Sequence, residues 1–121
     1  FATILGLMIY FMSSGVDVME WIKRGEVYGA GEILLTSIDR DGTGKGFDLD
    51  LIKLATENVS IPVIASGGIG IIQDIYEAIT LSNTDAIAMA YALHYDKINF
   101  NDVRNKLNSH KINVRNFNNH E

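Results

Sequence analysis

The chain has 121 residues, of which 47% are hydrophobic and 21% are charged, the composition of one globular domain rather than of a disordered or fibrous chain. Ten Lys and Arg residues against 15 Asp and Glu residues give a net charge of −5, so no basic excess is present to bind the phosphates of a nucleic acid. The absence of cysteine excludes disulfides, a thiolate nucleophile and cysteine-based metal sites. We therefore expect a cytoplasmic protein whose main partner is not nucleic acid.

The N-terminal segment Phe1–Met12 contains no charged residue. It is too short to cross a bilayer, which takes about 20 apolar residues, and no basic region or cleavage site accompanies it. We therefore expect no membrane anchor and no signal peptide, and a buried strand or another apolar core element is favoured. Because the first residue is Phe1 and not Met, we also expect that sequence upstream of it is missing.

Helical and extended patterns alternate along the rest of the chain. Apolar residues at helical spacing predict helices over residues 16–28, after a cap at Asp48, over 71–81, and over 101–109 with Asn101 as the cap. Short apolar runs that end in charged or Gly-rich turns predict strands over 32–38, 62–65 and 85–90. Trp21, Tyr28 and the methionines are expected to fill the core.

The predicted strands begin near residues 33, 62 and 86, and one helix separates each from the next. They are apolar throughout, as in a parallel sheet buried by covering helices, and this indicates an α/β fold. Such a fold is either an open doubly wound sheet or a closed (β/α)8 barrel of about 250 residues. With about half of that length and no linker, residues 1–121 are interpreted as a single unit.

The stretch Asp39–Gly46 follows the first of these strands and is rich in glycine and charge. Because ligands of parallel α/β proteins bind at the carboxyl ends of strands, this stretch is a candidate substrate loop. Its residues also match positions 1, 3, 5, 6 and 12 of an EF-hand calcium loop: Asp39, Asp41, Thr43, Gly44 and Asp50. The calcium alternative is disfavoured because a strand precedes the loop and position 12 is not Glu. A solvated turn without a ligand remains open.

A second candidate is the stretch Ala65–Gly70, where a strand meets a glycine-rich turn and then a helix. Glycine lets the backbone approach a phosphate, and a helix start supplies N–H donors and the positive end of its dipole. The pattern is neither a P-loop nor the complete dinucleotide fingerprint, and tight turns also use glycine for conformational reasons alone. A third candidate, Ala88–Ala92, ends the next strand. The loops after the last two strands of a barrel often form one phosphate site.

No other residues form a metal-ligand or nucleophile pattern. His94, His110 and His120 lack metal-ligand spacing, and Ser66 lacks both a nucleophile elbow and a nearby base. We therefore predict no metal and no cofactor, and surface or packing roles for the histidines.

The segment Gly29–Lys53 reads GAGEILLTSIDRDGTGKGFDLDLIK, and Ile61–Gly70 reads IPVIASGGIG. Together they closely resemble the cyclase subunit of imidazole glycerol phosphate synthase, and the resemblance extends more loosely over residues 15–115. It implies the C-terminal half of a (β/α)8 TIM-type barrel, about the last three to four βα units. The atypical apolar segment 1–14 and the polar tail 116–121 lie outside the resemblance.

The resemblance implies a lyase of histidine biosynthesis. The family takes ammonia from a glutaminase subunit and converts a phosphoribosyl-ribulotide into imidazole glycerol phosphate and aminoimidazole carboxamide ribotide. The substrate carries a phosphate at each end, and the resemblance implies that this part of the barrel binds one of them. By motif match, Asp41 is an auxiliary group for proton transfer. The matching substrate-binding and phosphate-binding residues are Thr36, Gly42, Ser66, Gly67, Gly68, Ala90 and Tyr91.

The sequence departs from the family pattern at two points. The family's principal catalytic aspartates lie on its first and fifth strands; the first strand would precede this chain, and Phe1–Met12, in the place of the fifth, has no carboxylate. Tyr91 stands where the family usually has a small serine, so its phenol either blocks the phosphate or replaces the contact with an O–H donor. We therefore expect the chain alone to bind a phosphorylated sugar or ribotide without turning it over.

Two further hypotheses remain open. One is a paralogue that takes ammonia from a similar glutaminase partner and aminates a sugar of surface glycans. The other is a non-catalytic half barrel that associates with itself, or with the missing N-terminal half, and so covers its open sheet edges and its apolar N-terminal segment.

Overall fold

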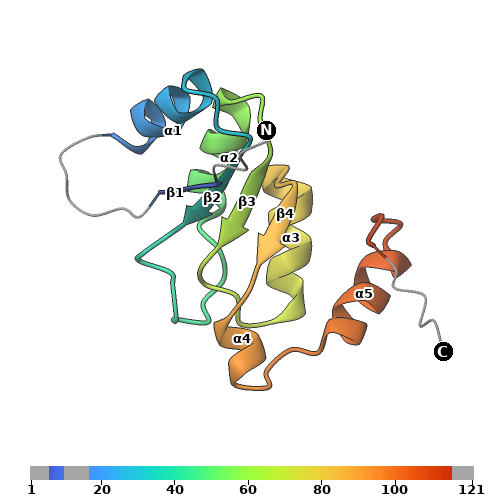
Figure 1. The fold of residues 1–121 in the computed structure, drawn as a ribbon. Coiled ribbons are helices and arrows are strands. Elements are labelled where there is room, and N and C mark those ends of the chain that lie inside the picture. The colour runs from blue at the N-terminus through green and yellow to red at the C-terminus, as the bar shows by residue number, and fades with distance from the viewer. Residues whose placement is uncertain (1–5, 10–16, 116–121) are drawn as a thin grey trace.

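The computed structural model describes residues 6–9 and 17–115, in which strands and helices alternate (Figure 1). The strands are β1 (Gly6–Ile9), β2 (Glu32–Thr36), β3 (Val63–Ser66) and β4 (Ala86–Ala88). The helices are α1 (Val18–Val27), α2 (Leu49–Asn58), α3 (Ile72–Ser82), α4 (Tyr91–His94) and α5 (Phe100–Ser109). The predicted alternation of helix and strand is confirmed for these residues.

The four strands form one sheet in the order β1-β2-β3-β4, and every neighbouring pair is parallel. A doubly wound sheet reverses its strand order at a switch point, whereas a barrel adds each strand beside the one before it. The sequential strand order therefore indicates that the sheet is an open part of a (β/α) barrel and not a doubly wound sheet. The described strands do not close into a ring.

Strand β1 lies within the apolar segment Phe1–Met12, for which a buried strand or another apolar core element is the prediction, and it pairs with β2. The rest of that segment and the polar tail 116–121 lie outside the described residues.

The helices cover one face of the sheet. Helix α1 packs against α2, and α2 packs against α3, which places all three on the same side (Figure 1). On that side Ile33 and Val63 are 0% and 1% exposed. Leu34 and Ile64, whose side chains point to the opposite face, are only half-buried. Both faces are apolar, but among the described residues only one is covered by helices.

Helix α1 contributes to the core through Val18, Ile22 and Gly25, which are buried. Trp21 and Tyr28 are 40% and 76% exposed, so the prediction that they fill the core is wrong. Trp21 lies beside the buried stripe and not on it, and its ring stacks with the guanidinium of a neighbouring arginine. Tyr28 is the C-terminal cap residue, beyond the face that α1 presents to the sheet.

Side-chain caps determine where three of the described helices begin, and in α1 the cap is Asp17, which accepts from the N–H groups of Met19 and Glu20. Asp48 accepts a hydrogen bond from the N–H of Leu51 at 3.1 Å, which confirms the cap predicted for α2. The cap of α5 is Asn99, whose side-chain oxygen accepts from the N–H of Asn101 at 2.7 Å. The prediction of Asn101 as the cap is therefore wrong: both side chains are suited to capping, and the extended backbone of Asn99 decides between them.

The strand predicted over 85–90 ends at Ala88, and the chain then forms the short helix α4. The N–H groups of His94 and Tyr95 donate to the carbonyls four residues earlier, at 2.8 and 3.1 Å. A short apolar run is compatible with either conformation, so periodicity did not separate strand from helix here. The early end of β4 places Tyr91 in the first turn of α4.

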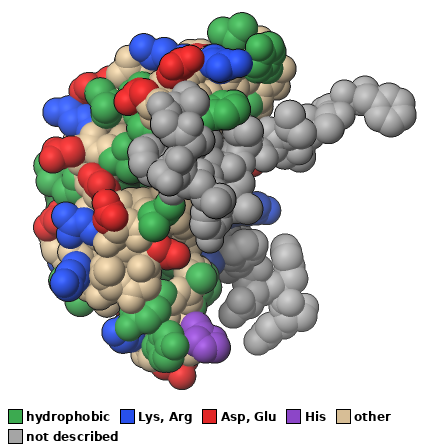
Figure 2. Space-filling model, turned by 90° about the vertical axis from the view of Figure 1, so that its left-hand side faces the viewer, with side chains coloured by type: hydrophobic (Ala, Val, Ile, Leu, Met, Phe, Trp, Pro, Cys, Tyr) green, Lys and Arg blue, Asp and Glu red, His purple; other side chains and the backbone are tan. Residues whose placement is uncertain are grey.

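The surface carries charges of both signs. Figure 2 shows Lys and Arg side chains interspersed with Asp, Glu and hydrophobic side chains over one face of the molecule. No helix in the described part of the chain has the length and apolar character needed to span a membrane.

Candidate functional site

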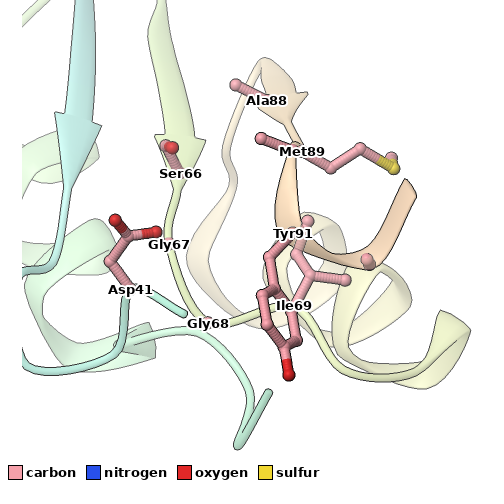
Figure 3. Close-up of a pocket in the computed structure, with 10 residues that line it drawn as sticks. Asp41, Ser66, Gly67, Gly68, Ile69, Ala88, Met89 and Tyr91 are labelled. Atoms are coloured by element: carbon pink, nitrogen blue, oxygen red, sulfur yellow. The ribbon is translucent and has the colours of Figure 1, made fainter. Parts of the chain in front are cut away.

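A pocket opens at the carboxyl ends of β3 and β4 (Figure 3). Three segments build it: the loop after β2, the turn after β3 and the connection from β4 to α4. Its lining residues are Asp41, Ser66, Gly67, Gly68, Ile69, Ala88, Met89, Ala90, Tyr91 and Ala92. The three candidate segments of the sequence meet here because parallel strands present their carboxyl ends at one edge of the sheet.

Most of the predicted site residues are among those that line the pocket: Asp41, Ser66, Gly67, Gly68, Ala90 and Tyr91. Thr36 is not a lining residue; it ends β2 beside Ser66 in the register of the sheet. Gly42 is exposed in the loop next to Asp41 and does not itself line the pocket. The other lining residues are Ile69, Ala88, Met89 and Ala92, which belong to the second and third candidate segments but were not predicted individually as site residues.

The loop Asp39–Gly46 packs directly on the turn after β3. The N–H of Gly46 donates to the carbonyl of Gly68 at 2.8 Å. A Cβ added to Gly68 would lie 2.2 Å from the Gly46 carbonyl oxygen, and one added to Gly70 would lie 2.1 Å from the Gly44 carbonyl oxygen. Gly68 also has a φ of +108°, which side chains rarely allow. Glycine is therefore required for this backbone packing, whether or not a ligand is bound.

Asp41 is held at the pocket by its backbone. Its N–H donates to the carbonyl of Ser37 at 2.9 Å, and the hydroxyl of Thr43 donates to the carbonyl of Arg40 at 2.7 Å within the same turn. The Asp41 carboxylate points from the loop toward Ser66 at the end of β3 (Figure 3). Asp41 is the one carboxylate among the lining residues and is exposed to solvent, so it has the chemistry of an auxiliary proton donor or acceptor.

Asp74 occupies part of the region that the sequence suggested for an anion. One of its carboxylate oxygens accepts hydrogen bonds from the N–H groups of Gly70 and Ile71, at 2.8 and 3.0 Å. These N–H groups belong to the start of α3, so the helix satisfies them with its own first-turn carboxylate. An anion in the pocket would instead meet the turn ahead of them, at Gly67 and Gly68. The sequence did contain a signal for this cap, because Asp74 is an acidic residue three positions after the predicted start of the helix.

Tyr91 lies at the outer rim of the pocket. Its ring lies beside Ile69, and its hydroxyl points away from the end of β4 (Figure 3). The ammonium of Lys97 donates to the hydroxyl oxygen at 3.0 Å and lies 4.5 Å from the ring centroid. The ring of Tyr95 packs against Tyr91 with a centroid separation of 4.8 Å. The phenol therefore leaves the strand ends open and presents its O–H at the rim.

Among residues 6–9 and 17–115, no group of three or more His, Asp or Glu side chains is arranged to hold a metal ion. The calcium-loop alternative thus finds no support in the geometry. His94 packs edge-on against Tyr95, and His110 packs against Tyr76, with centroid separations of 4.9 and 4.7 Å. These are packing contacts of the predicted kind, while His120 lies outside the described residues.

A family model described as "Histidine biosynthesis protein" matches residues 11–99, most of the chain. The chain belongs to the histidine biosynthesis protein family. The matched range includes every residue that lines the pocket, and it includes Thr36 and Gly42. The open parallel sheet is accordingly a partial (β/α) unit of the TIM barrel of this family.

Several relatives in this family are named "Imidazole glycerol phosphate synthase subunit HisF". The protein of Lachnoclostridium phytofermentans is 48% identical over 101 residues, which are 84% of this chain and 39% of the relative. That of Clostridium botulinum is 43% identical over 104 residues, 86% of this chain and 41% of the relative. That of Methanococcus maripaludis is 46% identical over 102 residues, 84% of this chain and 38% of the relative. The chain thus spans about two fifths of the length of these relatives.

Proposed function

We propose that this chain is part of the cyclase subunit of imidazole glycerol phosphate synthase. In that role it contributes to a lyase reaction of histidine biosynthesis that converts a phosphoribosyl-ribulotide and ammonia into imidazole glycerol phosphate and aminoimidazole carboxamide ribotide. The observation that carries the proposal is the meeting of six residues that match family substrate positions in one pocket at the strand ends. Relatives that are 43–48% identical bear the name of a subunit of this enzyme.

The pocket residues divide by chemistry in this proposal. Gly67, Gly68 and Ala90 bring backbone close to one phosphate of the substrate, because small residues leave room for an anion. Thr36 and Ser66, paired at the ends of β2 and β3, present hydroxyls to the substrate from the face without helices. Asp41 exchanges protons as an auxiliary group, and Gly42 belongs to the loop that closes on the phosphate. No metal or cofactor takes part.

Ring closure needs a general acid and a general base, yet the pocket is lined by a single carboxylate, that of Asp41. We therefore propose that this chain binds a phosphorylated ligand and that turnover needs residues from the remaining part of the barrel. The partners in the proposal are a glutaminase subunit that supplies ammonia and the N-terminal half of the barrel, and the location is the cytoplasm.

The test is calorimetric titration of the 121-residue chain with imidazole glycerol phosphate, with inorganic phosphate and calcium as comparison ligands. We expect the sugar phosphate to bind much more tightly than phosphate, because it adds contacts at the strand ends to those of the anion, and we expect no response to calcium. Ser66→Ala removes one hydroxyl, and it should weaken the binding of the sugar phosphate more than the binding of inorganic phosphate. Absence of binding by all three ligands would refute the proposal.

A further inference from the structure

The residues that line the pocket include no cationic side chain. Asp41 brings a carboxylate to it, and the carboxylate of Asp74 lies behind the turn that forms its floor. Both repel a phosphate dianion, and the repulsion is stronger in a partly enclosed pocket than in open water. A cation close to the rim would offset it. Arg40, Lys45 and Lys97 are cations near this region, and of these Lys97 donates a side-chain hydrogen bond to a lining residue.

Lys97 is fixed beside the pocket by its backbone and by its side chain. Its N–H donates to the carbonyl of Ala92, a buried lining residue, at 2.8 Å. Its ammonium donates to the Tyr91 hydroxyl oxygen at 3.0 Å. Tyr91 Cε1 and the Lys97 ammonium lie 3.6 and 3.9 Å from the position that a Cβ on Gly44 would occupy. The ammonium therefore sits where the loop after β2, the turn after α4 and the rim of the pocket meet.

We propose that Lys97, positioned by Tyr91, is a specificity-determining residue that makes this pocket select a phosphomonoester over an uncharged polyol. This inference rests on the proposed function, because it takes the pocket as a phosphate site. The Tyr91 oxygen accepts from Lys97, so its own proton is directed to another acceptor, and the ammonium polarises the O–H group and strengthens it as a donor. A phosphate oxygen at the rim then meets an O–H donor with a full positive charge behind it.

The experiment titrates the 121-residue chain with glycerol 3-phosphate and with glycerol by calorimetry at several NaCl concentrations. Lys97→Met removes the charge and keeps the length of the side chain, while Lys97→Arg keeps the charge. Lys53→Met is the matched control, because Lys53 lies on the exposed surface of α2, where it pairs with Glu57 at 3.9 Å. Tyr91→Phe keeps the ring contact and removes the hydroxyl. Chemical shifts of labelled Lys97 provide a readout at the residue itself.

We expect Lys97→Met to bind glycerol 3-phosphate about fivefold more weakly, with an affinity that depends less on salt. Lys97→Arg and Lys53→Met should bind glycerol 3-phosphate with the affinity of the unaltered chain. The affinity of Tyr91→Phe should lie between that value and the affinity of Lys97→Met. If the unaltered chain binds glycerol 3-phosphate and Lys97→Met binds it equally well at every salt concentration, the role of Lys97 is overturned and the phosphate site stands. If the unaltered chain does not bind it, both are overturned. If Lys97→Met and Lys53→Met lose affinity for glycerol 3-phosphate equally, the loss is due to the change in net charge, and the role of Lys97 is also overturned.

Discussion

Gly68 and Gly70 are the residues on which the shape of the pocket depends most directly. Each lies so close to a carbonyl oxygen of the loop after β2 that a side chain would have to displace that loop. The sequence suggested the turn as a phosphate site, and the structure adds a conformational reason for its glycines that holds without a ligand. Gly42 differs, because a Cβ there would meet no atom within 4 Å.

Gly68→Asp is expected to abolish phosphate binding, because it places a carboxylate against the anion and forces the Gly46 carbonyl away. Gly68→Ala keeps the steric conflict without the charge, and it should lower the free energy of unfolding by about 1–3 kcal/mol. Calorimetric titration with phosphate and urea denaturation measure the two effects. Gly31→Ala is the control, because its Cβ would lie in open space. A phosphate affinity that Gly68→Asp leaves unchanged would show that the turn is only structural.

At the scale of elements, a single carboxylate joins α1 to the segment that enters β3. Glu26, in the last turn of α1, accepts hydrogen bonds from the hydroxyl and from the N–H of Ser60, the latter at 2.8 Å. These hydrogen bonds favour the ionised form, so they hold the pKa of Glu26 below its ordinary value of 4.5. The contact links residues far apart in the sequence and helps to hold α1 against the sheet.

Glu26→Gln is expected to lower the Tm at pH 7, because a carboxylate accepts stronger hydrogen bonds than an amide oxygen. A folded-state pKa below the unfolded one means that the stabilisation is complete above about pH 4.5 and is lost as the pH falls through the folded-state pKa. The difference in Tm between the two proteins should therefore shrink as the pH falls below 4.5 and disappear below the folded-state pKa, in thermal unfolding followed by circular dichroism. Glu57→Gln, on the exposed side of α2, should change the Tm little. A difference that is the same at every pH would contradict the assignment.

At the scale of the whole molecule, the sheet is open on three sides. β1 and β4 each present an edge without a partner strand among the described residues, and the face opposite the helices carries the half-buried Leu34 and Ile64. Unpaired edges and uncovered apolar faces favour association. In a complete barrel the same face would line the interior and the same edges would pair with further strands.

We expect the isolated chain to form oligomers, with a mass by light scattering above the 13.4 kDa of one chain. Leu34→Lys places a charge on the uncovered face and should shift the population toward the monomer. Leu54→Lys, at an exposed position of α2, is the matched control and should leave the mass unchanged. A monodisperse monomer of the unaltered chain would contradict the expectation.

The sequence by itself determined the type and order of most elements and the three segments that form the pocket. Those features depend on local information: the period of apolar residues, caps such as Asp48, and glycines after strands. It also determined the parallel sheet, because apolar runs separated by single helices leave few other arrangements. Six predicted site residues came together for the same reason, since each follows or ends a strand of that sheet.

Only the tertiary structure decided which of several equally suitable residues does each task. Trp21 is exposed because the sheet meets α1 along the line of Ile22, and no local signal sets that rotation. The loop after β2 meets the turn after β3 through the hydrogen bond from Gly46 to Gly68, and Lys97 reaches Tyr91 only because α4 and its following turn reverse the chain. Such contacts depend on distances between segments that are separate in sequence, so periodicity and local propensity do not encode them.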